Sequence, residues 1–300
     1  MASNQFYEAS AQGRLDVMGG IADYSGSLVL QMPIREKTLV RLQLRSDFIC
    51  TFESSIESGD KLFATINYND YLEEGKVNYE FARRKLKDAP DISWIAYVLG
   101  CVLVLHHEKQ IDFKGVDFII ESDVPLGKGV SSSASLEVAT MKVLAKAFMI
   151  SFAGTELPVL AQRVENLVVG APCGLMDQLS SYFGEPRKLL PIVCQPDLIQ
   201  TPIGIPEDIS FLGIDSGIRH SVGGSSYADV RCAAFMGYTI IAQELGATRR
   251  EIRNAIDQHD FSLLPYRGYL CAISVAEFET RWKNKLPLTI SGKDFISHYG

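Results

Sequence analysis

A loop rich in glycine and serine constrains the fold of this chain more than any other segment. The loop runs from Val124 to Ser135 with the sequence VPLGKGVSSSAS. Residues 115–120 before it are typical of a buried strand, and apolar residues after it recur at helical spacing. Unpaired N–H groups and the positive end of a helix dipole favour a bound phosphate at such a helix start. Glycines let the backbone approach the anion, and serine hydroxyls can donate to it.

The loop alone also permits a simpler interpretation, a serine-capped helix start after a tight turn. Two well-known phosphate motifs do not fit. In a Walker loop the lysine is followed by Ser or Thr, but Lys128 is followed by Gly129. The dinucleotide fingerprint requires glycine at its sixth position, where this chain has Ser132.

Composition and charge narrow the possible partners. The chain has 300 residues, 47% of them hydrophobic, and a formal net charge of −7. These values are typical of a globular protein and argue against nucleic acid or an anionic membrane surface as the main partner. An anionic nucleotide would then be attracted by local features such as Lys128 and Arg14. The start MASNQFYEAS lacks the pattern of a signal peptide, so we expect a cytoplasmic protein.

Two other features predict buried residues and not functional ones. The apolar run from Trp94 to Leu105 is shorter than a membrane span and predicts a buried helix. The six cysteines form no close pair and have no histidine at ligand spacing, so we expect reduced thiols and no zinc site.

The order of elements favours an α+β fold. Period-two alternation predicts strands over 28–66, and an apolar helix is predicted at 94–107. A second helix is expected near 156–169, and helices should fill most of 225–260 and 275–284. Strands are also predicted at 187–193 and 209–215. Strands followed by mixed segments are typical of α+β proteins rather than of regular βαβ repeats.

Two further segments make the loop part of a larger pattern. The first, at 13–26, reads GRLDVMGGIADYSG, and the second, at 165–178, reads ENLVVGAPCGLMDQ. Together with the loop they resemble the GHMP sugar kinases, within that superfamily the galactokinases, and most closely the plant-type L-arabinokinases. The resemblance runs from about residue 13 to the end of the chain. It implies two lobes with the active site between them, and we expect domains at 1–195 and 196–300.

The resemblance also implies roles for particular residues. Asp177 and Arg14 match the catalytic aspartate and arginine, although a structural ion pair between them is the alternative. Ser133 and Glu165 match the positions that hold Mg²⁺. The residues expected to contact the phosphates of ATP are Gly127, Lys128, Gly129, Val130, Ser131, Ser132 and Ser133. Lys128 replaces the small residue usual there, and its side chain could contact phosphate or point to solvent.

The sugar site is expected to include residues from the segments at 13–26 and 165–178 and one residue further along the chain. Asp23 matches the carboxylate that binds two ring hydroxyls, Gly174 offers a backbone contact, and Tyr227 matches a tyrosine beside the sugar. Galactokinases have Glu-His where this chain has Gly20 and Ile21, and those two side chains meet the hydroxymethyl group of galactose. L-Arabinopyranose lacks that group, so a glycine and an isoleucine suit it better.

These observations predict an ATP- and Mg²⁺-dependent sugar 1-kinase whose substrate is L-arabinose. Two alternatives stay open: a galactokinase or glucuronokinase, and a catalytically silent protein that senses sugar and nucleotide. The family also has a third, glycine-rich motif that is not found before Gly300, so the second domain is expected to be incomplete at its C-terminus. Oligomeric state is not predicted.

Overall fold

The chain folds into two compact units, each made of more than one stretch of sequence. The structure, a computed structural model, describes residues 5–55, 61–217, 225–258 and 260–300. The first unit comprises residues 1–18, 30–191 and 199–222, and the second comprises residues 19–29, 192–198 and 223–300. This division differs from a single boundary at 195/196, because the chain passes between the units several times.

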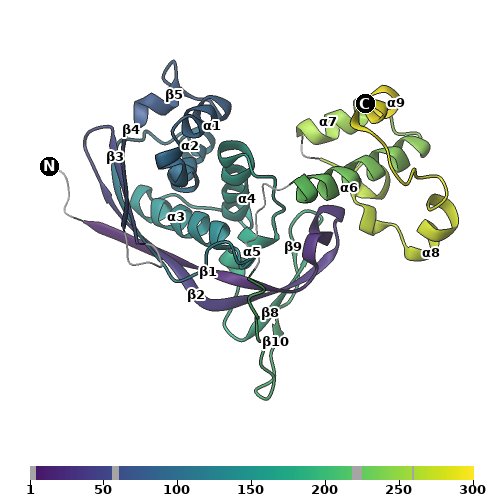
Figure 1. The fold of residues 1–300 in the computed structure, drawn as a ribbon, viewed down its shortest axis with the longest axis horizontal. Coiled ribbons are helices and arrows are strands. Elements are labelled where there is room, and N and C mark those ends of the chain that lie inside the picture. The colour runs from purple at the N-terminus through teal and green to yellow at the C-terminus, as the bar shows by residue number, and fades with distance from the viewer. Residues whose placement is uncertain (1–4, 56–60, 218–224, 259) are drawn as a thin grey trace. The chain divides into compact units, whose positions relative to one another are not determined.

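A mixed sheet forms the scaffold of the first unit (Figure 1). Its order is β10-β8-β2-β7-β3-β4, with β1 also paired to β2 and β9 to β8. Strands β3 and β7 are parallel, whereas β1 and β7 both run antiparallel to β2. The strands are β1 (Phe6–Met18), β2 (Leu28–Leu44), β3 (Ile49–Ser55), β4 (Lys61–Asn67), β7 (Val116–Ser122), β8 (Lys188–Val193), β9 (Leu198–Ile199) and β10 (Ile203–Gly204), with a small ribbon of β5 (Leu72–Glu73) and β6 (Lys76–Val77). The predicted α+β class is confirmed.

The helices of the first unit gather on one face of this sheet (Figure 1). They are α1 (Tyr79–Lys87), α2 (Ala96–Lys109), α3 (Ser132–Phe148), α4 (Glu156–Arg163) and α5 (Met176–Phe183). Helices α3 and α5 contact β1, and α2 and α4 pack on α3. A π-helical turn, Val164–Val169, continues α4. Such turns are rare and occur frequently at functional sites.

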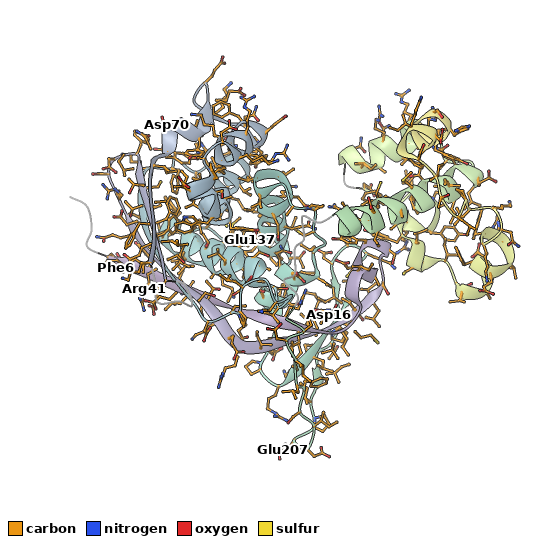
Figure 2. The ribbon with its side chains drawn as sticks, in the orientation of Figure 1. Phe6, Asp16, Arg41, Asp70, Glu137 and Glu207 are labelled. Atoms are coloured by element: carbon orange, nitrogen blue, oxygen red, sulfur yellow. The ribbon has the colours of Figure 1, made fainter. Side chains whose placement is uncertain are left out.

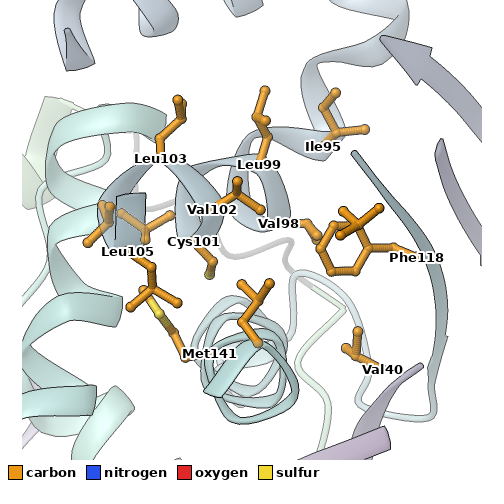
Figure 3. Packing of buried hydrophobic residues seen from close by; sticks show 14 of the residues in the cluster. Val40, Ile95, Val98, Leu99, Cys101, Val102, Leu103, Leu105, Phe118 and Met141 are labelled. Atoms are coloured by element: carbon orange, nitrogen blue, oxygen red, sulfur yellow. The ribbon is translucent and has the colours of Figure 1, made fainter. Parts of the chain in front are cut away.

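The core of the first unit is built around α2. Every residue from Val98 to Leu105 in this helix is buried, which is typical of a helix enclosed on all sides. Figure 3 shows side chains of this helix, among them Cys101 and Val102, above Met141 of α3, with Phe118 of β7 beside Val98. The segment Pro90–Lys109 is long and apolar enough to cross a membrane by composition. Its apolar side chains instead form the core, as expected of a buried helix.

The second unit is mainly helical in the residues that the structure describes. Its helices are α6 (Ser225–Glu244), α7 (Arg249–Gln258), α8 (Val275–Glu277) and α9 (Gly292–Tyr299), and a π-helical turn at Phe278–Trp282 continues α8. The helices predicted over 225–260 and 275–284 are therefore confirmed. Trp282 is almost completely buried against Ile241 and Ile273.

The prediction of a strand over 209–215 is wrong. The segment has no regular structure, and Phe211, Leu212 and Ile214 are exposed. A strand is stable only when a neighbour accepts and donates its backbone hydrogen bonds. No described strand pairs with this segment, so its apolar pattern alone does not produce one.

Helix α3 carries a carboxyl group into the core. Glu137 is 0% exposed, and its Oε2 accepts a hydrogen bond from Gln178 Nε2 at 3.1 Å. Burial, reinforced by the charge of Glu165, raises the pKa of Glu137 well above 4.5. The folded protein therefore holds a proton that the unfolded chain releases. The corresponding stability is present at acid pH and is lost as the pH rises above about 4.5 towards the folded pKa.

We expect Glu137→Gln to become more stable relative to the parent as the pH rises from about 5 to about 8. The neutral amide has no ionisation to suppress, so the difference in free energy of unfolding should grow by about 1–3 kcal/mol. Urea unfolding at several pH values measures this difference. Glu121→Gln, at an exposed position on β7, is the matched control. A difference between Glu137→Gln and the parent that stays constant with pH would contradict a protonated Glu137.

Candidate active site

The predicted phosphate loop connects β7 to α3. Gly127, Gly129 and Ser131 all adopt left-handed backbone conformations, with φ of 69°, 72° and 60°. Glycine has no steric penalty there, whereas serine has one. The Ser131 side chain makes no capping hydrogen bond, although the residue stands at the N-cap of α3. The simple serine-cap interpretation is therefore not supported.

An unsatisfied polar atom lies at this helix start. The hydroxyl oxygen of Ser131 is buried and has no hydrogen-bond partner among the described residues. A buried hydroxyl without a protein partner is costly, so this oxygen is available to bond a water molecule or a ligand. The N–H groups of the first turn of α3 also lack partners within the helix. Both features fit the phosphates of a nucleotide.

Strand β1 holds the loop in place through Gly13 and Arg14. The Arg14 N–H donates to the carbonyl of Val130 at 3.1 Å, and Nη1 donates to the carbonyl of Gly129 at 2.6 Å. A Cβ at Gly13 would lie 2.7 Å from the Val130 oxygen. A residue without a side chain is therefore required for this close contact between strand and loop.

The same arginine binds Asp177 in the first turn of α5. Nε and Nη2 of Arg14 both donate to Oδ1 of Asp177, at 3.0 and 2.6 Å. The Arg14 side chain is 8% exposed and that of Asp177 is 26% exposed. Among the described residues no hydrogen bond to Oδ2 of Asp177 is found. One carboxylate oxygen is thus held by the cation while the side chain stays partly accessible.

Ser133 and Glu165, the predicted magnesium ligands, are in contact. Glu165 lies in the π-helical turn after α4 and is 3% exposed. The Ser133 hydroxyl and the Cys173 thiol hydrogen-bond to its carboxylate. Burial, followed by the negative charge of Asp177, raises the pKa of Glu165 to about 7, and those hydrogen bonds partly oppose the shift.

This donor set fits magnesium better than a transition metal. The described residues contain no group of three or more His, Cys, Asp or Glu side chains arranged around a metal. Magnesium keeps several waters and takes phosphate oxygens from its substrate, so one carboxylate and one hydroxyl are sufficient. All six cysteines are unpaired thiols, as expected. Four of them are buried, but Cys232 and Cys271 of the second unit are exposed, so the prediction of buried residues is wrong for these two.

Lys128 has a defined partner in the structure. Its Nζ lies 2.7 Å from Oδ2 of Asp215, and the two side chains are 38% and 51% exposed. Exposed pairs of this kind contribute little to stability. The Lys128 side chain is therefore paired with an exposed carboxylate. This pairing differs from both predicted alternatives, a contact to phosphate and a side chain free in solvent.

The residues predicted to bind sugar fall in both units. Gly174 precedes α5 in the first unit, whereas Gly20, Ile21 and Asp23 belong to a 3₁₀ turn (Gly20–Ser25) of the second. Asp23 is buried, and its Oδ1 accepts a hydrogen bond from the N–H of Tyr24 at 3.0 Å.

Other members of this set differ in how far the structure describes them. Ile21 is 41% exposed, and a Cβ at Gly20, where φ is 55°, would meet no atom within 4 Å. Tyr24, the neighbour of Asp23, is not part of the predicted set and is buried with its ring under the guanidinium of Arg231. Tyr227 lies in α6, but its side chain is outside the described residues.

Three buried polar residues at this site were not singled out from the sequence. They are Glu137, Cys173 and Gln178. Glu137 follows Ser133 by four residues, and this helical spacing places both on one side of α3. Gln178 directly follows Asp177. The short distance in sequence from Glu137 to Ser133, and from Gln178 to Asp177, is the signal by which the sequence could have indicated them.

Comparisons with known proteins agree with the predicted family. Residues 96–185 match the family described as GHMP kinases N terminal domain. The chain is 39% identical, over 98% of its length, to L-arabinokinase of Arabidopsis thaliana. It is 32% identical, over 82% of its length, to a galactokinase of Chloroflexus aggregans. The chain spans 32% of the first of these proteins and 58% of the second.

A solved structure has the same fold. Galactokinase of Lactococcus lactis, determined in complex with galactose, covers 89% of this chain with a TM-score of 0.62 and 20% identity. The alignment covers 66% of that chain. The shared fold, the domain match and the two sequence relatives together establish that this chain belongs to the GHMP kinase family.

Proposed function

We propose that this chain carries the catalytic site of an ATP-dependent sugar kinase that phosphorylates the anomeric hydroxyl of L-arabinose. One observation carries the proposal. Arg14 binds the carboxylate of Asp177 and the backbone of a phosphate-type loop at the same time. With Asp177 as the proton acceptor and the loop as the phosphate site, one cation would contact both partners of a phosphoryl transfer to an alcohol, which supports the proposal.

The chemistry assigned to these residues is simple. Transfer forms a bond between the sugar oxygen and the γ-phosphorus, breaks the bond to the β,γ-bridging oxygen and releases the hydroxyl proton. Asp177 accepts or orients that proton, while Oδ1 stays bound to Arg14. The guanidinium offsets negative charge on the phosphoryl group as it moves.

The phosphates of ATP are assigned to the loop at the N-terminus of α3. Ser131, with its unpartnered hydroxyl, and the N–H groups of the first helical turn supply donors. Ser133 and Glu165 would hold Mg²⁺, which supplies charge neutralisation at the phosphate oxygens. The Lys128 ammonium group has three donors, so it could add a phosphate contact while still paired with Asp215.

We expect Asp177→Asn to lower kcat by about 100-fold or more while ATP and sugar binding change only a few-fold. The amide keeps the shape of the side chain but cannot accept the proton. Steady-state kinetics and equilibrium binding measure the two effects. Asp117→Asn, which removes the carboxylate of the Arg45 ion pair on β7, is the matched control and should keep normal turnover.

Two outcomes of this experiment would count against the role of Asp177. Near-normal turnover of Asp177→Asn would remove the residue from the chemistry. A variant that fails to fold would indicate that the pair with Arg14 is structural. A parent protein that binds sugar and ATP but shows no turnover on any sugar would favour the silent sensor.

We expect Ser133→Ala and Glu165→Ala to raise the Mg²⁺ concentration needed for half-maximal activity. Each removes one oxygen ligand, and even outer-shell changes weaken metal affinity by roughly 10-fold or more. Magnesium titrations at saturating ATP and sugar provide the measurement. Ser180→Ala, which removes a buried hydroxyl on α5, is the control. Titration curves that coincide with the parent would show that neither residue binds the metal.

The choice of sugar is tested at Gly20 and Ile21. We expect kcat/KM to be higher for L-arabinose than for D-galactose by up to about 100-fold, the usual limit for rejecting one added polar group. The double variant Gly20→Glu/Ile21→His should shift this ratio towards galactose. The introduced carboxylate and imidazole would have no hydrogen-bond partner on L-arabinose, which lacks the hydroxymethyl group. Steady-state kinetics on both sugars decide the matter.

Backbone strain must be separated from specificity in that test. Gly20 has φ of 55°, so any side chain is strained there whatever space is available. Gly20→Ala carries the same strain without a carboxylate and should leave the ratio unchanged. If the unmodified protein prefers D-galactose, the L-arabinose assignment is refuted, whereas the assignment as a sugar kinase still holds.

A further inference from the structure

A buried amide connects two carboxyl groups behind the proposed catalytic pair. Gln178, on α5, is 0% exposed, and its Nε2 donates to Oε2 of Glu165 at 3.0 Å and to Oε2 of Glu137 at 3.1 Å. An amide nitrogen has two hydrogens, so these two shorter bonds use its donor capacity, and the Cys173 sulfur lies further away at 3.9 Å. Figure 2 shows Glu137 among the helices of the first unit.

The network is closed at its two ends by the same helix. Ser133, at the start of α3, hydrogen-bonds to Glu165, and Glu137 lies one helical turn further along α3. The contacts therefore run from Ser133 to Glu165, on to Gln178 and back to Glu137. Helices α3 and α5 and the turn after α4 are all joined by these side chains.

Packing does not explain why polar groups occupy these positions. Glu137 makes no ion pair with a described residue, and Oε1 of Glu137 and Oε1 of Gln178 are buried without hydrogen-bond partners. Hydrophobic residues of similar volume would avoid this desolvation cost and are often neutral or stabilising at such sites. A polar arrangement that lowers stability is retained more readily where it orients a functional group.

We infer that Gln178 is a positioning residue that holds the Glu165 carboxylate in the orientation required for the divalent cation, and that Glu137 anchors the Gln178 amide. The inference rests on the proposed function, since Glu165 is a metal ligand only there. Glu137 acts only as a hydrogen-bond acceptor for the Gln178 amide, so glutamine at this position, which keeps an acceptor oxygen, should anchor Gln178 equally well. Its elevated pKa is consistent with a neutral group.

Four variants test the inference. Gln178→Leu removes the donor, Glu137→Leu removes the anchor, and Glu137→Gln keeps an acceptor oxygen. Thr140→Val removes another buried hydrogen bond of α3, from Oγ1 to the carbonyl of Leu136, and controls for general destabilisation. Binding of Mn²⁺ with a non-hydrolysable ATP analogue, followed by electron paramagnetic resonance, gives a readout that is independent of turnover.

We expect Gln178→Leu and Glu137→Leu to weaken Mn²⁺ binding by roughly 10- to 100-fold, the range for residues that orient metal ligands. The sugar KM should change less than about 3-fold, because no sugar contact is lost. Glu137→Gln and Thr140→Val should bind Mn²⁺ like the parent. If Gln178→Leu does not fold, the comparison of Glu137→Leu with Glu137→Gln decides.

The result that overturns the inference is distinct from failure of the proposed function. Glu165→Ala is measured alongside. If Glu165→Ala weakens Mn²⁺ binding but Gln178→Leu and Glu137→Leu do not, the positioning role is wrong and the metal assignment stands. Equal weakening by Glu137→Gln and Glu137→Leu would also refute the anchor. If Glu165→Ala binds Mn²⁺ like the parent, the assignment of Glu165 as a metal ligand is wrong, and the positioning role of Gln178 is refuted with it.

Discussion

The guanidinium of Arg14 is the interaction on which the proposed site depends. It reaches the loop carbonyl of Gly129 with one nitrogen and Oδ1 of Asp177 with the other two. The backbone N–H of the same residue holds Val130. A lysine has no such planar fork and could not make these contacts together. The position of the loop relative to α5 is therefore set by one nearly buried side chain of β1.

Three acidic side chains, Asp177, Glu165 and Glu137, lie in the same region as the Arg14 guanidinium. Asp177 is paired with Arg14, whereas Glu165 and Glu137 are buried and both accept hydrogen bonds from the amide of Gln178. Burial and the charge of Asp177 raise the pKa of Glu165 to about 7. The folded state thus holds groups that resist ionisation, a cost that a divalent cation at Glu165 would lower. If the proposed metal assignment holds, part of this cost in stability is recovered when the cation binds.

Sequence patterns predicted several helices and strands correctly, but they did not predict which strands pair or which buried polar side chains contact each other. The loop between strand and helix and the buried helix α2 were predicted, because each depends on spacing or on a motif. The contact between Ser133 and Glu165 was not predicted as such, although the resemblance had assigned both residues to one metal site. Helix α1 was missed within a polar stretch, although Asn78 caps it by accepting from the N–H groups of Glu80 and Phe81. Residues 209–215 show the reverse error, since an apolar pattern cannot reveal that no strand lies beside it. Glu137 and Gln178 were missed because hydrophobic patterns do not mark buried polar groups.

Gly20 illustrates how backbone conformation can be linked to substrate choice. The space around it is open, so glycine is not required to avoid a collision. Its left-handed φ of 55° is the reason, since a side chain there costs about 1–2 kcal/mol. A glutamate at this position would be favoured only if a substrate hydroxyl returned more than that strain through hydrogen bonding. Under the proposed L-arabinose assignment the substrate lacks that hydroxyl and nothing offsets the strain, so glycine would be the better residue at position 20.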